Sequence, residues 1–260
     1  LQQVPGSPRS HLLLARAHWA LGKTNEVLAV LRRATEQVPA SLQAQWRLGF
    51  CQTVRQREAE DFLWERSMTQ PDPSMAGILV TLASRARPED LKGPRLKALT
   101  TLAPPDPADQ VALGQLLARA TQSDAAAAQF RRALSSTNTT TQREAVKGLA
   151  ALGHASEAAP VLFDWIQRRP QWFVQDLTLA VAAAKTRSPA MIEGLDAVWK
   201  AASTDEGQRL AYALLLDYGR GQTNELAARW ATVASTPGVA IAQLEVLATL
   251  SAEAGQQEAQ

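Results

Sequence analysis

The sequence predicts an all-α fold, a solenoid of stacked antiparallel helix pairs. Three observations lead to this prediction. Prolines recur at one constant interval, at Pro5, Pro39, Pro73 and Pro107. A large apolar residue followed by a small one returns at the same interval, at Leu14-Ala15, Leu48-Gly49 and Leu82-Ala83. Elsewhere apolar residues recur with the spacing of amphipathic helices, and no segment alternates regularly between apolar and polar residues as a strand would.

Composition narrows the class of protein further. With 260 residues, of which 46% are hydrophobic and 20% charged, the chain can bury a sizeable core. The sequence has no apolar run as long as the roughly 18 residues that a membrane span needs, so we expect no direct membrane insertion. A net charge of +2 is too small to indicate nucleic-acid binding. The single cysteine, Cys51, excludes an internal disulfide and leaves the compartment open.

The first repeat is predicted over residues 8–39, with helices over 10–21 and 25–37. The turn between them reads Gly22-Lys23-Thr24-Asn25-Glu26, in which the glycine can end one helix and a Thr or Asn can cap the next. Nearly the same string returns at Gly221-Gln222-Thr223-Asn224-Glu225. We therefore expect the two turns to share one conformation.

The same pattern predicts the later elements in order. Repeat two has helices over 42–54 and 58–68, and repeat three over 75–86 and 89–102, where Pro88 suits a helix start. After the linker at 104–107 the register shortens, because Leu113-Gly114 follows Leu82-Ala83 sooner than the earlier pairs follow one another. Pro160 predicts a local distortion in the second helix of repeat five. The remaining predicted helices span 141–152, 156–167, 173–184, 189–202, 208–218, 224–234 and 239–253.

In the first repeat, the large-small pair is followed by a turn glycine, two packing residues and a closing proline. These positions are filled by Leu14, Ala15, Gly22, Leu31, Ala34 and Pro39. The pattern and its period resemble the tetratricopeptide repeat, which is about 34 residues long. Repeat four matches as well, through Leu113, Gly114, Leu117, Ala126, Phe130 and Ala133. Val27, where alanine is usual, and His11 and His18, where bulky residues are usual, depart from the family pattern. The resemblance implies a right-handed superhelix whose first helices line a concave groove.

The repeats divide the chain into five segments. We expect residues 1–7 to be the tail of a preceding repeat, 8–106 to hold repeats one to three, 107–172 repeats four and five, 173–238 the degenerate repeats six and seven, and 239–260 the first helix of a truncated eighth. Leu1 to Pro5 mimics Thr35 to Pro39 at the repeat spacing, and the last residues read as a turn glycine and the start of a helix. The array is therefore expected to extend beyond both ends.

If the geometry of the family carries over, counting from the large-small pair selects the side chains that face the groove. The candidate partner-binding residues are Arg16, Trp19, Trp46, Phe50, Arg87, Arg119, Arg143, Lys147 and Lys185. The early positions are aromatic and the middle ones basic, so the resemblance implies a groove for an acidic protein or peptide. The alternative is that the tryptophans pack between units and the cations are solvated, because an error of one residue in helix phase moves every side chain. The groove lacks the asparagines of the lysine-asparagine clamp found in chaperone-binding members.

Motifs that carry chemistry are missing, so we predict no enzyme, no cofactor and no metal site. His11, His18 and His154 form no metal-ligand pattern, and Glu144 and Asp176 stand as isolated surface acids. No phosphate-binding glycine loop and no serine or cysteine nucleophile motif occurs.

The prediction is a non-catalytic protein–protein interaction scaffold, a repeat segment of a larger bacterial protein. One alternative is a periplasmic assembly or spacer platform of an envelope or exopolysaccharide-export complex. Another is a regulatory repeat segment attached to an enzyme or a DNA-binding domain. Either the cytoplasm or the periplasm fits these readings.

Overall fold

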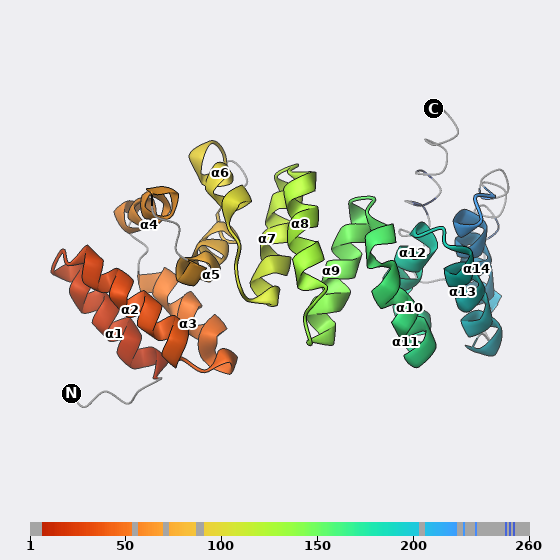
Figure 1. The fold of residues 1–260 in the computed structure, drawn as a ribbon, viewed down its shortest axis with the longest axis horizontal. Coiled ribbons are helices and arrows are strands. Elements are labelled where there is room, and N and C mark those ends of the chain that lie inside the picture. Colours follow the sequence, from red (N-terminus) through yellow and green to blue (C-terminus); the bar gives the residue numbers. More distant parts are fainter. Residues whose placement is uncertain are drawn as a thin grey trace. The chain divides into compact units, whose positions relative to one another are not determined.

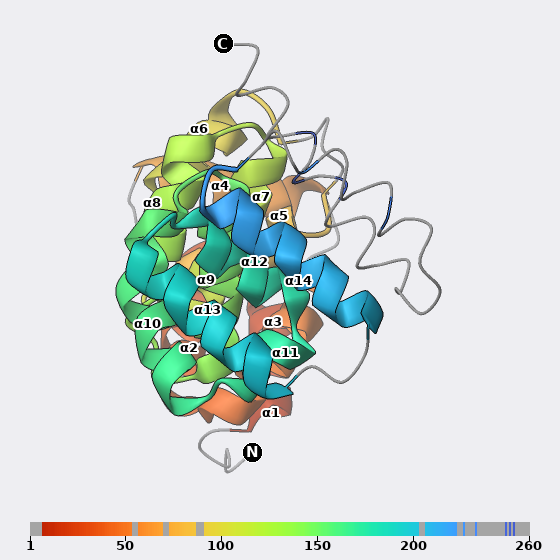
Figure 2. The same ribbon diagram turned by 90° about the vertical axis from the view of Figure 1, so that its right-hand side faces the viewer.

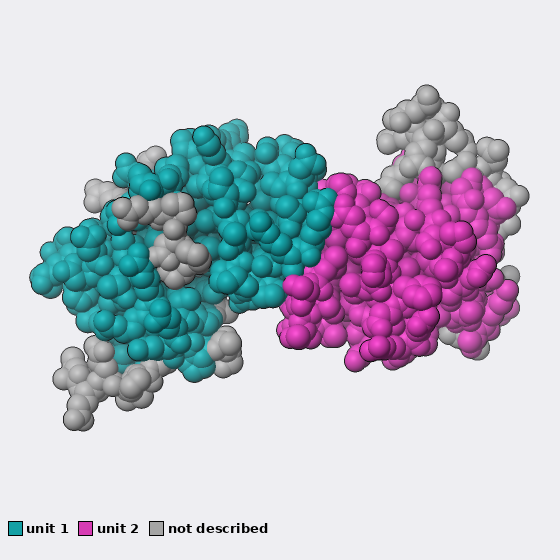
Figure 3. Space-filling view, in the orientation of Figure 1, with its two compact units in different colours: residues 1–132 teal, residues 133–260 magenta. Residues whose placement is uncertain are grey.

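A computed structural model describes residues 7–53, 57–69, 73–86, 91–202 and 206–222, together with 226, 232, 248, 250 and 252. The chain forms two compact units, which we call unit 1 (Leu1–Arg132) and unit 2 (Ala133–Gln260) (Figure 3). In the residues described, every regular element is a helix. The predicted all-α fold class is therefore confirmed.

Unit 1 is built from paired helices, labelled in Figure 1. They are α1 (Pro8–Ala20), α2 (Thr24–Gln37), α3 (Ala40–Thr53), α4 (Arg57–Thr69), α5 (Pro73–Ala83), α6 (Pro94–Thr101), α7 (Pro107–Arg119) and α8 (Ser123–Ala133), which ends at the unit boundary. The first helices of successive pairs pack in sequence, α1 on α3, α3 on α5 and α5 on α7, while α4 packs on α6. This nearest-neighbour packing is how repeat units share their apolar faces.

Unit 2 repeats the arrangement with one added helix. Its elements are α9 (Thr139–Ala151), the 3₁₀ helix η2 (Ala155–Ala158), α10 (Ala159–Arg168), α11 (Gln171–Gln175), α12 (Leu177–Lys185), α13 (Pro189–Ala202) and α14 (Glu206–Gly219). Helix α12 packs on α9 and on α14, and α13 packs on both α10 and α11. Figure 2 shows α14 beside α12 and α13.

The first two residues of the recurrent turn adopt the same conformation at both occurrences. Gly22 has φ +67° and Gly221 has φ +73°, the left-handed region that glycine enters at little cost. In each turn the following N–H closes the helix end, with Lys23 N donating to His18 O and Gln222 N donating to Asp217 O, both at 2.9 Å. The prediction is confirmed for this part of the turn, whereas residues 223–225 lie outside the described residues.

Two predicted helices differ from those observed by more than three residues at an end or by a break. Helix α6 begins at Pro94 rather than at residue 89, because Gly93 lies in the left-handed region (φ +57°) and Pro94 occupies the first helical turn; Pro88 lies outside the described residues. The helix predicted over 173–184 is broken at Asp176, whose extended backbone separates α11 from α12. The distortion expected at Pro160 is confirmed, since η2 precedes α10 there.

A glutamine at the fourth position of three first helices links each helix to the chain before it. Gln43 Nε2 donates to the carbonyls of Ala34, Thr35 and Val38 at 3.2, 3.1 and 2.8 Å. Gln110 Nε2 donates to Pro104 O at 2.8 Å, and Gln142 Nε2 donates to Leu134 O at 2.9 Å. These bonds satisfy carbonyls at and beyond helix carboxyl ends, which have no partner within their own helix.

The division of the chain into repeats stays a prediction, as does the right-handed superhelix. The second helix of repeat seven and the whole of the truncated eighth fall almost entirely on residues outside the described part of the chain. The same holds for residues 1–6 of the predicted tail.

Candidate partner-binding site

Two of the predicted aromatic anchors are in the core of unit 1. Trp46 and Phe50 of α3 are 0% and 1% exposed, and their rings stack at a centroid distance of 5.7 Å with 21° between the planes. A partner cannot reach either ring without unfolding the surrounding packing. The burial of Trp46 fits the alternative, in which the tryptophans pack between units.

Arg16 and Trp19 remain accessible on α1. Arg16 is exposed, and Trp19 is half-buried with its ring centroid 6.0 Å from that of Phe62 in α4. An indole held on one side and open on the other is suited to contact a partner. Both side chains are therefore accessible, and their role in binding a partner stays a prediction.

Arg119 lies beside a cavity of about 460 Å³ within unit 1. The cavity is formed where α5 and α7 end and α6 begins. Its apolar walls include Ala83, Leu91, Leu96 and Leu116, and two exposed cations, Lys92 and Arg119, also line it. Arg87, another predicted site residue, lies outside the described residues.

The two cations are not neutralised by the surroundings that the structure describes. Neither Lys92 nor Arg119 forms an ion pair with any described residue. The carboxyl end of α7 is already closed, since Thr121 N donates to Ala118 O at 3.0 Å and Gln122 N donates to Leu117 O at 2.9 Å. These two carbonyls of the last turn of α7 are therefore satisfied by backbone N–H groups and do not need Arg119 as a hydrogen-bond donor.

Thr121, which also lines the cavity, has an unusual backbone conformation. Its φ of +58° places a β-branched residue in the left-handed region, at the turn position that Gly22 fills in the first repeat. We expect Thr121→Gly to raise the free energy of unfolding by about 1 kcal/mol, because the strain is relieved. Urea denaturation would measure the change, and a destabilised Thr121→Gly variant would contradict it.

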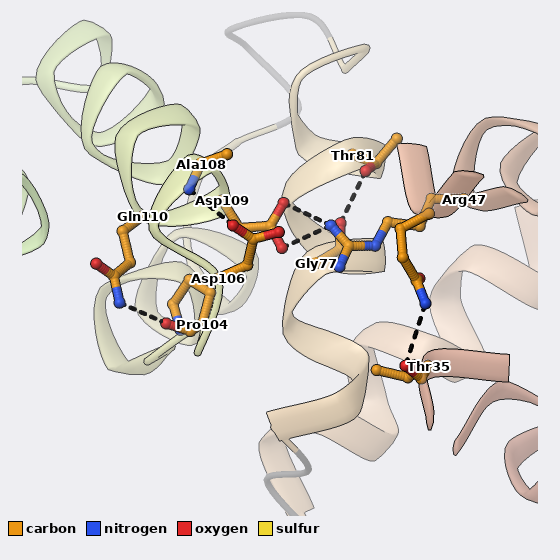
Figure 4. Close-up of polar contacts among 10 residues, drawn as sticks. Thr35, Arg47, Gly77, Thr81, Pro104, Asp106, Ala108, Asp109 and Gln110 are labelled. Atoms are coloured by element: carbon orange, nitrogen blue, oxygen red, sulfur yellow. Dashed lines mark hydrogen bonds and ion pairs between the residues drawn. The ribbon is translucent and has the colours of Figure 1, made fainter. Parts of the chain in front are cut away.

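A contact that the sequence did not predict joins three first helices of unit 1. Arg47 Nη1 of α3 donates to both carboxylate oxygens of Asp109 in α7, each at 2.6 Å (Figure 4). The guanidinium crosses α5 at Gly77, where an added Cβ would lie 2.5 Å from Arg47 Cζ and 2.6 Å from Asp109 Oδ2. A side chain at position 77 would displace the guanidinium or the carboxylate from this geometry. Burial raises the pKa of Asp109, although the charge and hydrogen bond of Arg47 act in the opposite direction.

In unit 2 the structure brings Arg143 and Lys147 of α9 together on one carboxylate. Asp176, the residue that separates α11 from α12, accepts from Arg143 Nη2 at 2.6 Å and lies 3.0 Å from Lys147 Nζ. The prediction that Asp176 is an isolated surface acid is wrong, because only 16% of its side chain is exposed. Glu144 is paired as well, at 3.3 Å from Lys147. These two cations are therefore held by intramolecular partners.

Aromatic contacts complete this cluster. The Arg143 guanidinium lies 5.4 Å from the Trp172 ring centroid, the Arg169 guanidinium lies 4.5 Å from it, and Trp165 meets Trp172 edge-on at 5.6 Å. Cation–π contacts of this kind fix side-chain positions. Lys185 does not join the cluster, since it ends α12 at the end opposite Asp176.

The charge of Asp176 makes the stability of unit 2 depend on pH. Burial alone would raise its pKa, but hydrogen bonds from Thr178, Lys147 and Arg143 and the charge of Lys147 lower the pKa to about 2. A carboxyl whose folded pKa is depressed stabilises the fold above the unfolded pKa, and this contribution is lost as the pH falls toward 2. The shift corresponds to at most about 2 kcal/mol at neutral pH, because solvent screens part of the interaction.

Asp176→Asn should remove that contribution while keeping a side chain that can cap α12. We expect the difference in unfolding free energy between wild type and variant to shrink as the pH is lowered from about 5 to about 2. Asp164→Asn is the matched control, because its exposed pair with Arg168 should contribute less than about 0.5 kcal/mol. A difference between wild type and Asp176→Asn that stays constant over this range would refute the assignment.

Comparison with known proteins supports the resemblance. The family profile described as "Tetratricopeptide repeat" matches residues 8–51, and no match to the chain is found among curated proteins or solved structures. None of the described helices is long and apolar enough to cross a membrane. Within the same residues, no three His, Cys, Asp or Glu side chains gather where they could hold a metal ion. The family is generally non-catalytic and suggests a protein–protein interaction scaffold. Residues 8–51, which fold as α1, α2 and most of α3, thus carry tetratricopeptide repeat sequence.

Proposed function

We propose that the protein is a non-catalytic interaction scaffold and that unit 1 binds a segment of a partner protein at the cavity between α5, α6 and α7. The observation that carries the proposal is the cavity itself, with its apolar walls and its two cations, Lys92 and Arg119. A concave, mostly apolar site with a few placed polar groups is the usual form of a binding site.

The placement of the other predicted residues supports the choice of unit 1. Arg119 is accessible at the cavity, whereas Arg143 and Lys147 of unit 2 are engaged by Asp176. Arg16 and Trp19 offer a further accessible surface on α1. The partner is a protein rather than a nucleic acid, because two cations beside apolar walls do not suit a polyphosphate backbone. Its bound segment carries acidic residues.

A peptide selection tests the proposal. Random dodecapeptides displayed on phage are selected on the immobilised protein, and the enriched sequences are measured by fluorescence polarisation against two variants. Ala120→Trp places a large ring at a residue that lines the cavity, and Ala20→Trp places the same ring at an exposed site at the end of α1. We expect affinity to fall about tenfold or more in the first variant and to stay within about twofold in the second.

Circular dichroism and thermal melts establish that both variants are folded. The proposal is wrong if no peptide is enriched, or if the enriched peptides bind folded Ala120→Trp as tightly as wild type.

A further inference from the structure

We propose that the cavity of unit 1 takes one apolar side chain of the partner segment and that Lys92 and Arg119 bind carboxylates flanking that side chain. The inference rests on the proposed function and specifies the chemistry of the segment. It differs from a groove formed by first helices alone, since Lys92 lies just before the second helix α6 while Arg119 ends the first helix α7.

The walls of the cavity select for an apolar occupant. Leu91 and Ala83 are 7% and 0% exposed and are part of the core, so the apolar lining of the cavity is backed by tightly packed residues. A volume of about 460 Å³ is at the small end of the range for ligand sites. That size has room for an apolar side chain such as leucine together with the backbone that carries it, and filling it removes apolar surface from water.

The cations select for negative charge next to that side chain. Lys92 and Arg119 come from different elements, and neither is paired with a described acidic residue. Two cations from separate walls favour a segment that carries acids on both sides of its apolar residue. Arginine can bind a carboxylate through two parallel hydrogen bonds, whereas lysine contributes a compact charge. The apolar cavity and the two cations together favour binding of an acidic, leucine-containing segment and disfavour a basic one.

Three fluorescein-labelled peptides test this reading against the wild-type protein. The reference peptide has one leucine with two aspartates on each side, in Gly-Ser flanks. In the second the aspartates are replaced by lysines, and in the third the leucine is replaced by serine. We expect the reference peptide to bind at least about tenfold more tightly than either of the others, and its affinity to fall with added salt.

Charge-reversed variants of the protein test whether Lys92 and Arg119 are the cations that bind the aspartates of the peptide. Lys92→Glu/Arg119→Glu should lower the affinity for the reference peptide by about tenfold or more. The control Lys23→Glu/Arg33→Glu makes the same change in net charge at exposed residues that do not line the cavity. It should change the affinity less than about threefold. Equal weakening by both double variants would show that only the overall charge of the protein matters, and would overturn the inference.

The outcomes separate this inference from the proposed function. If selected peptides lose affinity in Ala120→Trp but are indifferent to Lys92→Glu/Arg119→Glu, the cavity binds a partner and the acidic reading is wrong. If the reference peptide binds no more tightly than the lysine or the serine peptide, this inference is wrong and the proposed function is unaffected. If Ala120→Trp affects no peptide, the proposed function itself fails.

Discussion

Arg47→Ala should lower the free energy of unfolding by about 3–5 kcal/mol, which is the range expected when one partner of a buried ion pair is removed. Arg47 and Asp109 side chains are 14% and 13% exposed, so both charges are largely withdrawn from water. Asp109 is short and is held on α7, and without Arg47 its carboxylate would remain buried with no described cation on it. Urea denaturation at neutral pH measures the loss.

The pH dependence of this loss has a definite sign. Burial raises the pKa of Asp109 even with Arg47 present, and removing Arg47 removes an interaction that lowers it. A carboxyl with a raised folded pKa favours the fold at low pH, and this contribution is lost as the pH rises through that pKa. The penalty of Arg47→Ala should therefore be largest at neutral pH and should shrink in acid.

A double variant supplies the control. Arg47→Met/Asp109→Leu replaces both charges by apolar side chains, and such replacements are often neutral or stabilising. We expect it to be within about 1 kcal/mol of wild type. A single Arg47→Ala variant that costs less than the double variant would show that the pair does not join α3 to α7 in solution.

Trp46→Ala should cost about 3–5 kcal/mol, as expected for truncating a fully buried aromatic residue. The ring is 0% exposed and stacks on Phe50, so its removal leaves a cavity inside unit 1. Its Nε1 has no hydrogen-bond partner among the described residues, so the loss comes from packing alone. A thermal melt followed by circular dichroism reports the destabilisation.

Trp19→Ala is the matched comparison, because the same side chain is only half-buried there. It should cost less than half as much as Trp46→Ala, since less apolar surface is lost from the core. If instead Trp46→Ala is as stable as Trp19→Ala, Trp46 is not the core residue described above.

Local signals predicted the helices well where proline or glycine fixes a boundary. Pro189 begins α13, whose bounds coincide with the predicted span 189–202, and Gly22 follows the end of α1 with a positive φ, as expected of a glycine that ends a helix. The start of α6 was predicted too early, from Pro88, whereas Gly93 ends the preceding loop with a positive φ and Pro94 begins the helix. Periodicity identifies a helix more reliably than it identifies its first residue.

The candidate site depended on helix phase and was predicted less well. Counting from the large-small pair selected Trp46, but the neighbouring residue Arg47 is the one that crosses α5, and one residue turns a helix by about 100°. Asp109 is far from Arg47 along the chain. Their contact follows from how three helices stack, and no local spacing in the sequence encodes it. Gly77, a glycine inside a helix, was the only local sign of that close approach.

The glutamines at the fourth helical position have a consequence for how such a chain can change in length. The interval from Gln43 to Gln110 falls slightly short of two repeat periods, and the interval from Gln110 to Gln142 falls slightly short of one. Each glutamine nevertheless reaches a carbonyl of the preceding segment. Because a flexible amide side chain makes the connection, a linker can lose a residue or two without uncoupling one helical hairpin from the next. Connections shortened by one or two residues should accordingly be tolerated as long as the glutamine is kept.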